Sequence, residues 1–200
     1  QFNDHETGAQ DDLITAFRTL KTAGVADLVL DLRRNSGGYL YIALTAASMI
    51  TGPQANGQVF ERLQYNGKRD NETATSTLLF SGQVQFAEPQ YPAGTPLPQL
   101  SLPRVFVLTT GSTCSASESI INSLRGIGVQ VVRVGTTTCG KPYGFRQKNN
   151  CGYAYFPIEF QGTNAQGFGD YTTGFQPTCN IADNGDAPGS STDPLLNGAL

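Results

Sequence analysis

Residues 28–38 read LVLDLRRNSGG, and this stretch predicts the fold class. The apolar run at residues 28–32 is typical of a short strand buried in a parallel sheet. Residues 35–38 form a glycine-rich turn, and a helix is predicted after it, through about Ile50. A strand, a glycine turn and a helix in this order form one α/β unit. We therefore expect an α/β fold with a mainly parallel sheet flanked by helices.

The same pattern recurs on both sides of this unit. Leu13, Phe17 and Leu20 have the i, i+4, i+7 spacing of an amphipathic helix, which we predict over residues 9–22. Later in the chain we predict, in order, a strand, a helix and a strand: residues 104–109, 115–125 and 130–134. A chain of 200 residues is the size of one domain.

Residues 53–103 interrupt the α/β pattern. They are rich in Pro, Gly, Gln and Asn and contain two predicted strands, at residues 58–65 and 77–86. We expect an inserted β-hairpin or lid within the domain. A second hairpin is predicted from residues 143–148 and 153–160, followed by loops over residues 161–192. Asp193 and Pro194 then predict the start of a helix, as N-cap and first helical residue.

Composition excludes several classes of protein. The chain has 16 Asp and Glu against 13 Lys and Arg and no basic stripe, so a nucleic-acid partner is not expected. No apolar run approaches the roughly 20 residues of a membrane span. The chain starts at Gln1 and shows no leader peptide, which suggests a processed or trimmed product. Nothing in the sequence predicts the oligomeric state.

Four cysteines bear on the compartment: Cys114, Cys139, Cys151 and Cys179. They lack the close paired spacing of zinc sites, so neither a metal nor another cofactor is predicted. An even number of cysteines in a chain with few charges suggests two disulfides and an exported protein, periplasmic or extracellular. Four cysteines allow three pairings, and the spacing leaves them open.

A serine and a lysine follow two of the predicted strands. Ser115 opens the helix after the strand at residues 104–109, so its hydroxyl lies at a helix N-terminus. Free backbone N–H groups there can hold an oxyanion. Lys141 follows the next strand and can act as the base for that serine. This arrangement indicates a hydrolase.

Both segments also have other interpretations. Ser115 and Glu118 fit the S-x-x-E capping box of an ordinary helix start. Residues 135–141, GTTTCGK, fit the pattern of a phosphate-binding loop. There, however, Pro142 stands where Ser or Thr would bind Mg²⁺, and the residues after it are poor helix formers. The glycine turn at residues 37–38 and the presence of both Ser and Lys favour hydrolysis.

His5 is the one histidine of the chain, so a Ser–His catalyst would have to use it. It follows a short predicted strand near the N-terminus, which allows a place at the active site. An isolated polar histidine before a helix is more often a surface or capping residue. The sequence thus leaves two roles for His5: a surface or capping residue, or an auxiliary base or orienting group at the active site.

With these residues in view, the chain resembles the carboxyl-terminal processing (tail-specific) serine peptidases. Residues 30–38 resemble their D-L-R-x-N-x-G-G turn, residues 113–118 (TCSASE) their S-A-S-E segment, and residues 135–141 their G-x-x-T-x-G-K segment. The order and spacing agree, over roughly residues 9–160. Three motifs in the same order are far more specific than any one of them.

The resemblance implies a crotonase-like α/β fold and a serine endopeptidase that cleaves unstructured polypeptides through an acyl-enzyme. Ser115 would be the nucleophile and Lys141 its general base. Backbone N–H groups of Gly37, Gly38 and Ala116 would form the oxyanion hole. A lysine base must be neutral before it acts, which requires burial and exclusion of water.

Two departures from the family pattern concern the lysine and the domain content. A glutamine often follows the family lysine by four residues, but Phe145 stands there and Gln147 lies two residues further on. The usual PDZ-type module is absent. Residues 1–200 therefore resemble a peptidase core cut on its N-terminal side.

The resemblance also bears on the cysteines and on an alternative function. If Ser115 and Lys141 touch, Cys114 and Cys139 are neighbours, which leaves Cys151 to pair with Cys179. The alternative is a non-catalytic module of the same fold that binds apolar ligands or peptides, similar to retinoid-binding modules. Such a module has no need of a serine and a lysine together.

Overall fold

The computed structural model describes residues 1–200 and has a parallel sheet at its centre. The order of the strands is β1-β4-β5-β10, and every neighbouring pair is parallel. Their bounds are β1 (Val29–Asp31), β4 (Arg104–Thr109), β5 (Gln130–Gly135) and β10 (Cys179–Asn180). The predicted α/β class with a parallel sheet is confirmed.

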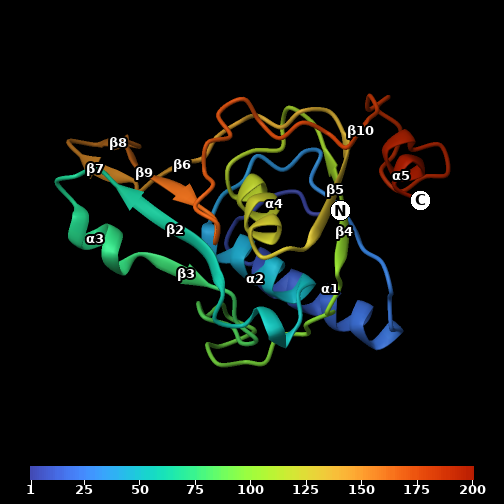
Figure 1. Cartoon of the computed structure of the whole chain (residues 1–200), viewed down its shortest axis with the longest axis horizontal. Coiled ribbons are helices and arrows are strands. Elements are labelled where there is room, and N and C mark those ends of the chain that lie inside the picture. The colour runs from blue at the N-terminus through green and yellow to red at the C-terminus, as the bar shows by residue number, and fades with distance from the viewer.

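Helices cover both faces of this sheet (Figure 1). Their bounds are α1 (Ala9–Ala23), α2 (Leu40–Ile50), α4 (Ala116–Gly126) and α5 (Pro194–Ala199). Val105 and Val107 of β4 belong to the main core together with residues of α1, α2 and α4. The alternate residue Leu108 packs against Leu195 of α5 on the other face. Successive side chains of a strand point to opposite faces, so β4 is buried on both.

A second, antiparallel sheet lies beside α4, with strand order β3-β2-β9-β6 (Figure 1). Its strands are β2 (Val59–Tyr65), β3 (Thr77–Leu79), β6 (Tyr143–Phe145) and β9 (Ile158–Thr163). A separate hairpin joins β7 (Lys148–Asn150) to β8 (Tyr153–Tyr155). The short helices are η1 (Pro53–Ala55) and α3 (Asp70–Thr75). No helix is long and apolar enough to cross a membrane.

Some predicted boundaries are wrong. The strand predicted at residues 77–86 is β3 alone, because Phe80 turns into the core and the chain then continues without regular structure. The predicted hairpin of residues 143–160 is split in two: β6 pairs with β9, while β7 pairs with β8. Neither α3 nor the two-residue strand β10 was predicted. Helix α3 buries no residue, so it has no amphipathic pattern to detect.

A buried arginine joins the C-terminal helix to the loop after β1. The side chain of Arg33 is fully buried and donates two hydrogen bonds to Asp193, of 3.0 and 2.6 Å, and one of 3.0 Å to Asp31. Asp193 is also the N-cap of α5 and accepts from the N–H groups of Leu195 and Leu196. The Arg33 guanidinium lowers the pKa of Asp193 to about 2. The ion pair therefore fixes the position of α5 against the loop that contains residues 35–38.

We predict that Asp193→Asn destabilises the fold by about 3 kcal/mol, because it leaves the buried Arg33 charge without its bidentate partner. Urea denaturation measures the change. Asp183→Asn is the matched control, since Asp183 lies 3.4 Å from Arg33 but is partly exposed. It should cost less than about 1 kcal/mol. Equal losses in the two variants would contradict this assignment.

Candidate active site

Three loops meet at the carboxyl edge of the parallel sheet. They follow β1, β4 and β5, which are consecutive neighbours in that sheet. They contain the three segments that the sequence indicated: residues 35–38, 113–118 and 135–141. Ligand sites of open α/β sheets lie at this edge.

Ser115 has a strained backbone at the start of α4. Its φ is 55° and its ψ is −118°, a combination that non-glycine residues rarely adopt. Such strain costs of order 1–3 kcal/mol and persists only where the surroundings impose it, often at active sites. Ser117, the other serine of the motif, is buried and donates its hydroxyl to the Asn35 carbonyl oxygen, 3.0 Å away. Ser115 is therefore the better placed nucleophile.

The glycine turn lies directly against Ser115. A Cβ on Gly37 would lie 2.8 Å from the Ser115 Cβ and 2.8 Å from the Ala116 nitrogen, so only glycine fits there. The Gly37 N–H donates to Asn35 Oδ1 at 2.9 Å. It is therefore not free to hold an oxyanion, and the prediction of Gly37 as an oxyanion donor is wrong. The N–H groups of Gly38 and Ala116 donate to no acceptor in the chain. These two remain as candidate oxyanion donors.

Asn35 connects the turn to the serine segment. It is fully buried, and its carbonyl oxygen accepts from the Cys114 N–H at 3.1 Å as well as from Ser117. Its Nδ2 donates to the Phe2 carbonyl oxygen at 3.0 Å. One side chain and its backbone thus fix the glycine turn relative to the start of α4.

Glu118 connects the serine segment to the lysine loop. Its buried carboxylate accepts from the backbone N–H of Ser115 at 3.1 Å, of Gly140 at 2.8 Å and of Lys141 at 2.8 Å. The Thr138 hydroxyl donates to it at 2.5 Å. The contact with Ser115 is one half of the capping box that the sequence indicated. The other contacts join Glu118 to residues 138–141, in the loop that contains Lys141. Glu118 therefore holds both functional segments at once.

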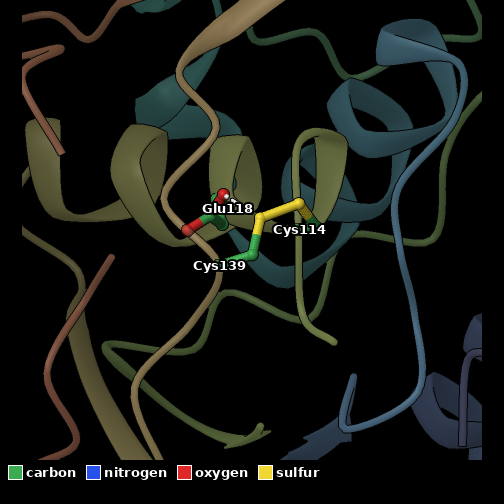
Figure 2. Close-up of side chains that lie close together, drawn as sticks. All are labelled: Cys114, Glu118 and Cys139. Atoms are coloured by element: carbon green, nitrogen blue, oxygen red, sulfur yellow. Dashed lines mark hydrogen bonds between the residues drawn. A yellow bond between two sulfur atoms is a disulfide. The ribbon is translucent and has the colours of Figure 1, made fainter. Parts of the chain in front are cut away.

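A disulfide joins the same two segments. Cys114 and Cys139 are bonded, with Cα atoms 5.2 Å apart, and the bridge lies beside the Glu118 carboxylate (Figure 2). The predicted Cys114–Cys139 pairing is confirmed. The three groups are close enough to suggest a metal site. Because the two sulfur atoms are bonded to each other, they offer no thiolate to a metal.

The second predicted disulfide is wrong. Cys151 and Cys179 are both free and exposed. Cys151 lies in the turn between β7 and β8, whereas Cys179 lies in β10 at the edge of the parallel sheet. The inference by elimination failed because it assumed that all four cysteines are paired.

Ser115 and Lys141 line two adjoining cavities, of about 300 and about 640 Å³. Gly38 lines both cavities with them. The Lys141 Nζ lies 4.7 Å from the centre of the Phe145 ring, and no hydrogen bond joins it to the Ser115 hydroxyl. The lysine therefore lies over an aromatic ring that lines the same two cavities.

The two auxiliary candidates occupy different places. His5 is buried, lines neither cavity, and shares a 3.0 Å hydrogen bond between its Nδ1 and Asn35 Oδ1. Burial lowers its pKa to about 4, so it is neutral near pH 7. Gln147 lines the larger cavity together with Lys141, and its Nε2 donates to Asn149 Oδ1 at 2.7 Å. His5 thus supports the glycine turn from outside the two cavities, whereas the side-chain hydrogen bond of Gln147 goes to Asn149.

Glu61 was not singled out in the sequence, yet it lines the smaller cavity and is only 3% exposed. Its Oε1 accepts from the Ser119 hydroxyl at 3.2 Å, whereas its Oε2 has no hydrogen-bond partner. Burial raises the pKa of Glu61 to about 7, and the Ser119 hydrogen bond opposes this only in part. The inward alternation of Glu61, Leu63 and Tyr65 in β2 was the available signal.

Comparisons with known proteins agree on one family. The sequence model of peptidase family S41 matches residues 1–149. A solved structure described as an S41 protease from Bacteroides fragilis has a TM-score of 0.82 at 28% identity, over 98% of this chain and 51% of that one. The chain thus spans about half the length of that relative. No curated protein matches the sequence.

More distant solved structures share the fold. A photosystem II D1 C-terminal processing protease has a TM-score of 0.61 at 20% identity, over 90% of this chain and 40% of that one. A lipoprotein from Streptococcus agalactiae has a TM-score of 0.56 at 15% identity, over 90% of this chain and 59% of that one.

We predict that Glu118→Gln lowers the free energy of unfolding by about 2–3 kcal/mol, because the amide NH₂ would face backbone N–H groups that need an acceptor. Chemical denaturation with the disulfide intact measures this. Glu72→Gln on helix α3 is the control: its carboxylate pairs with Arg69, but both side chains are partly exposed, so the change should cost less than about 1 kcal/mol. A Glu118→Gln protein as stable as the control would show that these hydrogen bonds are dispensable.

A second prediction concerns pH. The unfolded Glu61 ionises above about pH 4.5, but the folded group ionises only near pH 7, so stability is lost as pH rises between these values. Glu61→Gln should therefore gain on the order of 3 kcal/mol over wild type at pH 8 relative to pH 4.5. His5 has the opposite dependence between about pH 4 and 6.5. Because both proteins contain His5, its contribution cancels when the free energies of unfolding of variant and wild type are subtracted. A difference that does not vary with pH would rule out the raised pKa.

Proposed function

Because the chain belongs to peptidase family S41, we propose that it is a serine endopeptidase that cleaves unstructured polypeptide segments. Ser115 would be its nucleophile and Lys141 its general base. One observation carries this proposal: the two residues line the same cavities from loops that follow neighbouring parallel strands. The strained Ser115 backbone and the unpaired N–H groups of Gly38 and Ala116 support it.

In the proposed acylation step, the Ser115 Oγ attacks the carbonyl carbon of the scissile peptide bond. Its proton passes to the neutral Lys141 Nζ, and the carbonyl oxygen becomes an oxyanion that the N–H groups of Gly38 and Ala116 stabilise. When the tetrahedral intermediate collapses, the carbon–nitrogen bond breaks. Lys141 returns the proton to the leaving amine, and an ester to Ser115 remains.

In the proposed deacylation step, a water molecule loses a proton to Lys141 and attacks the ester carbonyl carbon. The second tetrahedral intermediate uses the same two N–H groups. It collapses to release a carboxylic acid, and the proton on Lys141 returns to the Ser115 oxygen. Both steps require the lysine side chain to turn from the Phe145 ring toward Ser115. Catalytic contacts are often long before substrate binds.

We further propose a crotonase-like topology for the α/β core and a lid role for residues 53–103. The lid role is supported by Leu78 and Phe86, which belong to this segment and line the cavity beside Ser115. A non-catalytic binding module of the same fold is the alternative. It gives no reason for a strained serine and an unpaired lysine in one cavity, so we favour the enzyme.

We also propose that the protein acts in an oxidising compartment, periplasmic or extracellular. The Cys114–Cys139 disulfide supports this, because cytosolic reductants keep such thiols reduced.

We predict that Ser115→Ala and Lys141→Ala each reduce cleavage of an unstructured peptide by at least about 1,000-fold, since nucleophile and base act as one unit. Labelling by a fluorophosphonate probe should be lost in Ser115→Ala. Ser117→Ala is the matched control and should retain labelling. Full cleavage by the Ser115→Ala protein would refute the nucleophile, and labelling lost only in Ser117→Ala would move it to that residue.

A further inference from the structure

Glu61 is a buried lining residue of the cavity next to Ser115. Apolar side chains of Leu40, Leu63 and Phe160 line the same cavity, while Glu61 and Ser119 contribute carboxylate and hydroxyl groups. A volume of about 300 Å³ beside the nucleophile admits one side chain of a bound polypeptide. The cavity therefore combines apolar walls with a single acid.

Two local features of the second sheet position the Glu61 side chain. A β-bulge in β2 shifts the register between Val59 and Glu61, and bulges of this kind re-aim side chains near functional sites. On the neighbouring strand β9, a Cβ on Gly162 would lie 1.8 Å from Glu61 Oε1. A side chain at position 162 would displace the carboxylate from this place. The bulge and Gly162 together accommodate the Glu61 carboxylate at the cavity wall.

The unpaired oxygen is the feature that calls for a ligand. A buried carboxylate without a partner is costly, and buried acids are normally paired or hydrogen-bonded. The Glu61 Oε2 has no partner in the chain. A long apolar stem that ends in a cation would fill the apolar walls and reach this oxygen.

We propose that Glu61 makes the enzyme select polypeptides with a lysine or arginine directly beside the scissile bond, whose cationic end pairs with Glu61 Oε2. The inference rests on the proposed peptidase activity. Lys141 and Arg146 also line the cavity, but neither pairs with Glu61 Oε2. The Lys141 Nζ lies over the Phe145 ring, and Arg146 donates to the Tyr65 hydroxyl at 3.2 Å.

The test first maps the cleavage sites of the wild-type protein in a denatured, alkylated protein substrate at pH 8, by mass spectrometry. Lysine and arginine should be enriched at one flanking position. Synthetic peptides built on the strongest site then carry lysine, norleucine, glutamine or glutamate at that position. We expect the lysine peptide to exceed the norleucine peptide in kcat/KM by roughly 30-fold or more.

The variant Glu61→Gln should bring that lysine-to-norleucine ratio close to one, whereas Glu72→Gln on the exposed helix α3 should keep the wild-type ratio. A wild-type ratio near one, a preference for glutamine, or a ratio unchanged in Glu61→Gln would each overturn the inference. The wild-type arm does not depend on the variant folding. Fluorophosphonate labelling of Ser115 with no lysine preference would refute this inference alone. If the wild-type protein shows no labelling and no cleavage, the peptidase proposal and this inference are both refuted.

Discussion

The arrangement of the site depends on a single buried carboxylate. Glu118 accepts hydrogen bonds from the start of its own helix and from the loop of Lys141, across 23 residues of sequence in the second case. A carboxylate is suited to this because its two oxygens accept about four hydrogen bonds and donate none. The Cys114–Cys139 bond joins the same two segments covalently. Removal of either connection leaves the other, but only the carboxylate satisfies the buried backbone donors.

Most of the remaining site is made of backbone held by side chains. Asn35 holds the glycine turn, Gly37 lies close against Ser115, and the Gly38 and Ala116 N–H groups donate to no acceptor in the chain. His5 hydrogen-bonds Asn35 from outside the cavities. Donors fixed in this way need no reorganisation when charge develops, which is the basis of electrostatic catalysis. The residues that support the turn thus matter as much as those that face the substrate.

The sequence predicts what periodicity and strand ends determine. The core helices and strands have clear patterns, and the carboxyl ends of parallel strands bring residues 35–38, 113–118 and 135–141 together. Pairings between distant segments leave no such pattern, so β10 and the free state of Cys151 and Cys179 were not predicted. The hydrogen bond that occupies the Gly37 N–H is a local Asx turn from Asn35, a signal that the sequence contains but that the expectation for the oxyanion donors did not use.

Charge around the site is controlled by burial as well as by pairing. Arg33 and Glu118 are buried with full sets of partners, whereas burial favours the neutral forms of His5 and Glu61. Glu61 differs from His5 in lining the cavity, so a ligand can change its surroundings. A cation bound there would favour the ionised carboxylate and release its proton. Substrate selection and ionisation of Glu61 would then be one linked equilibrium, set by the same unpaired oxygen.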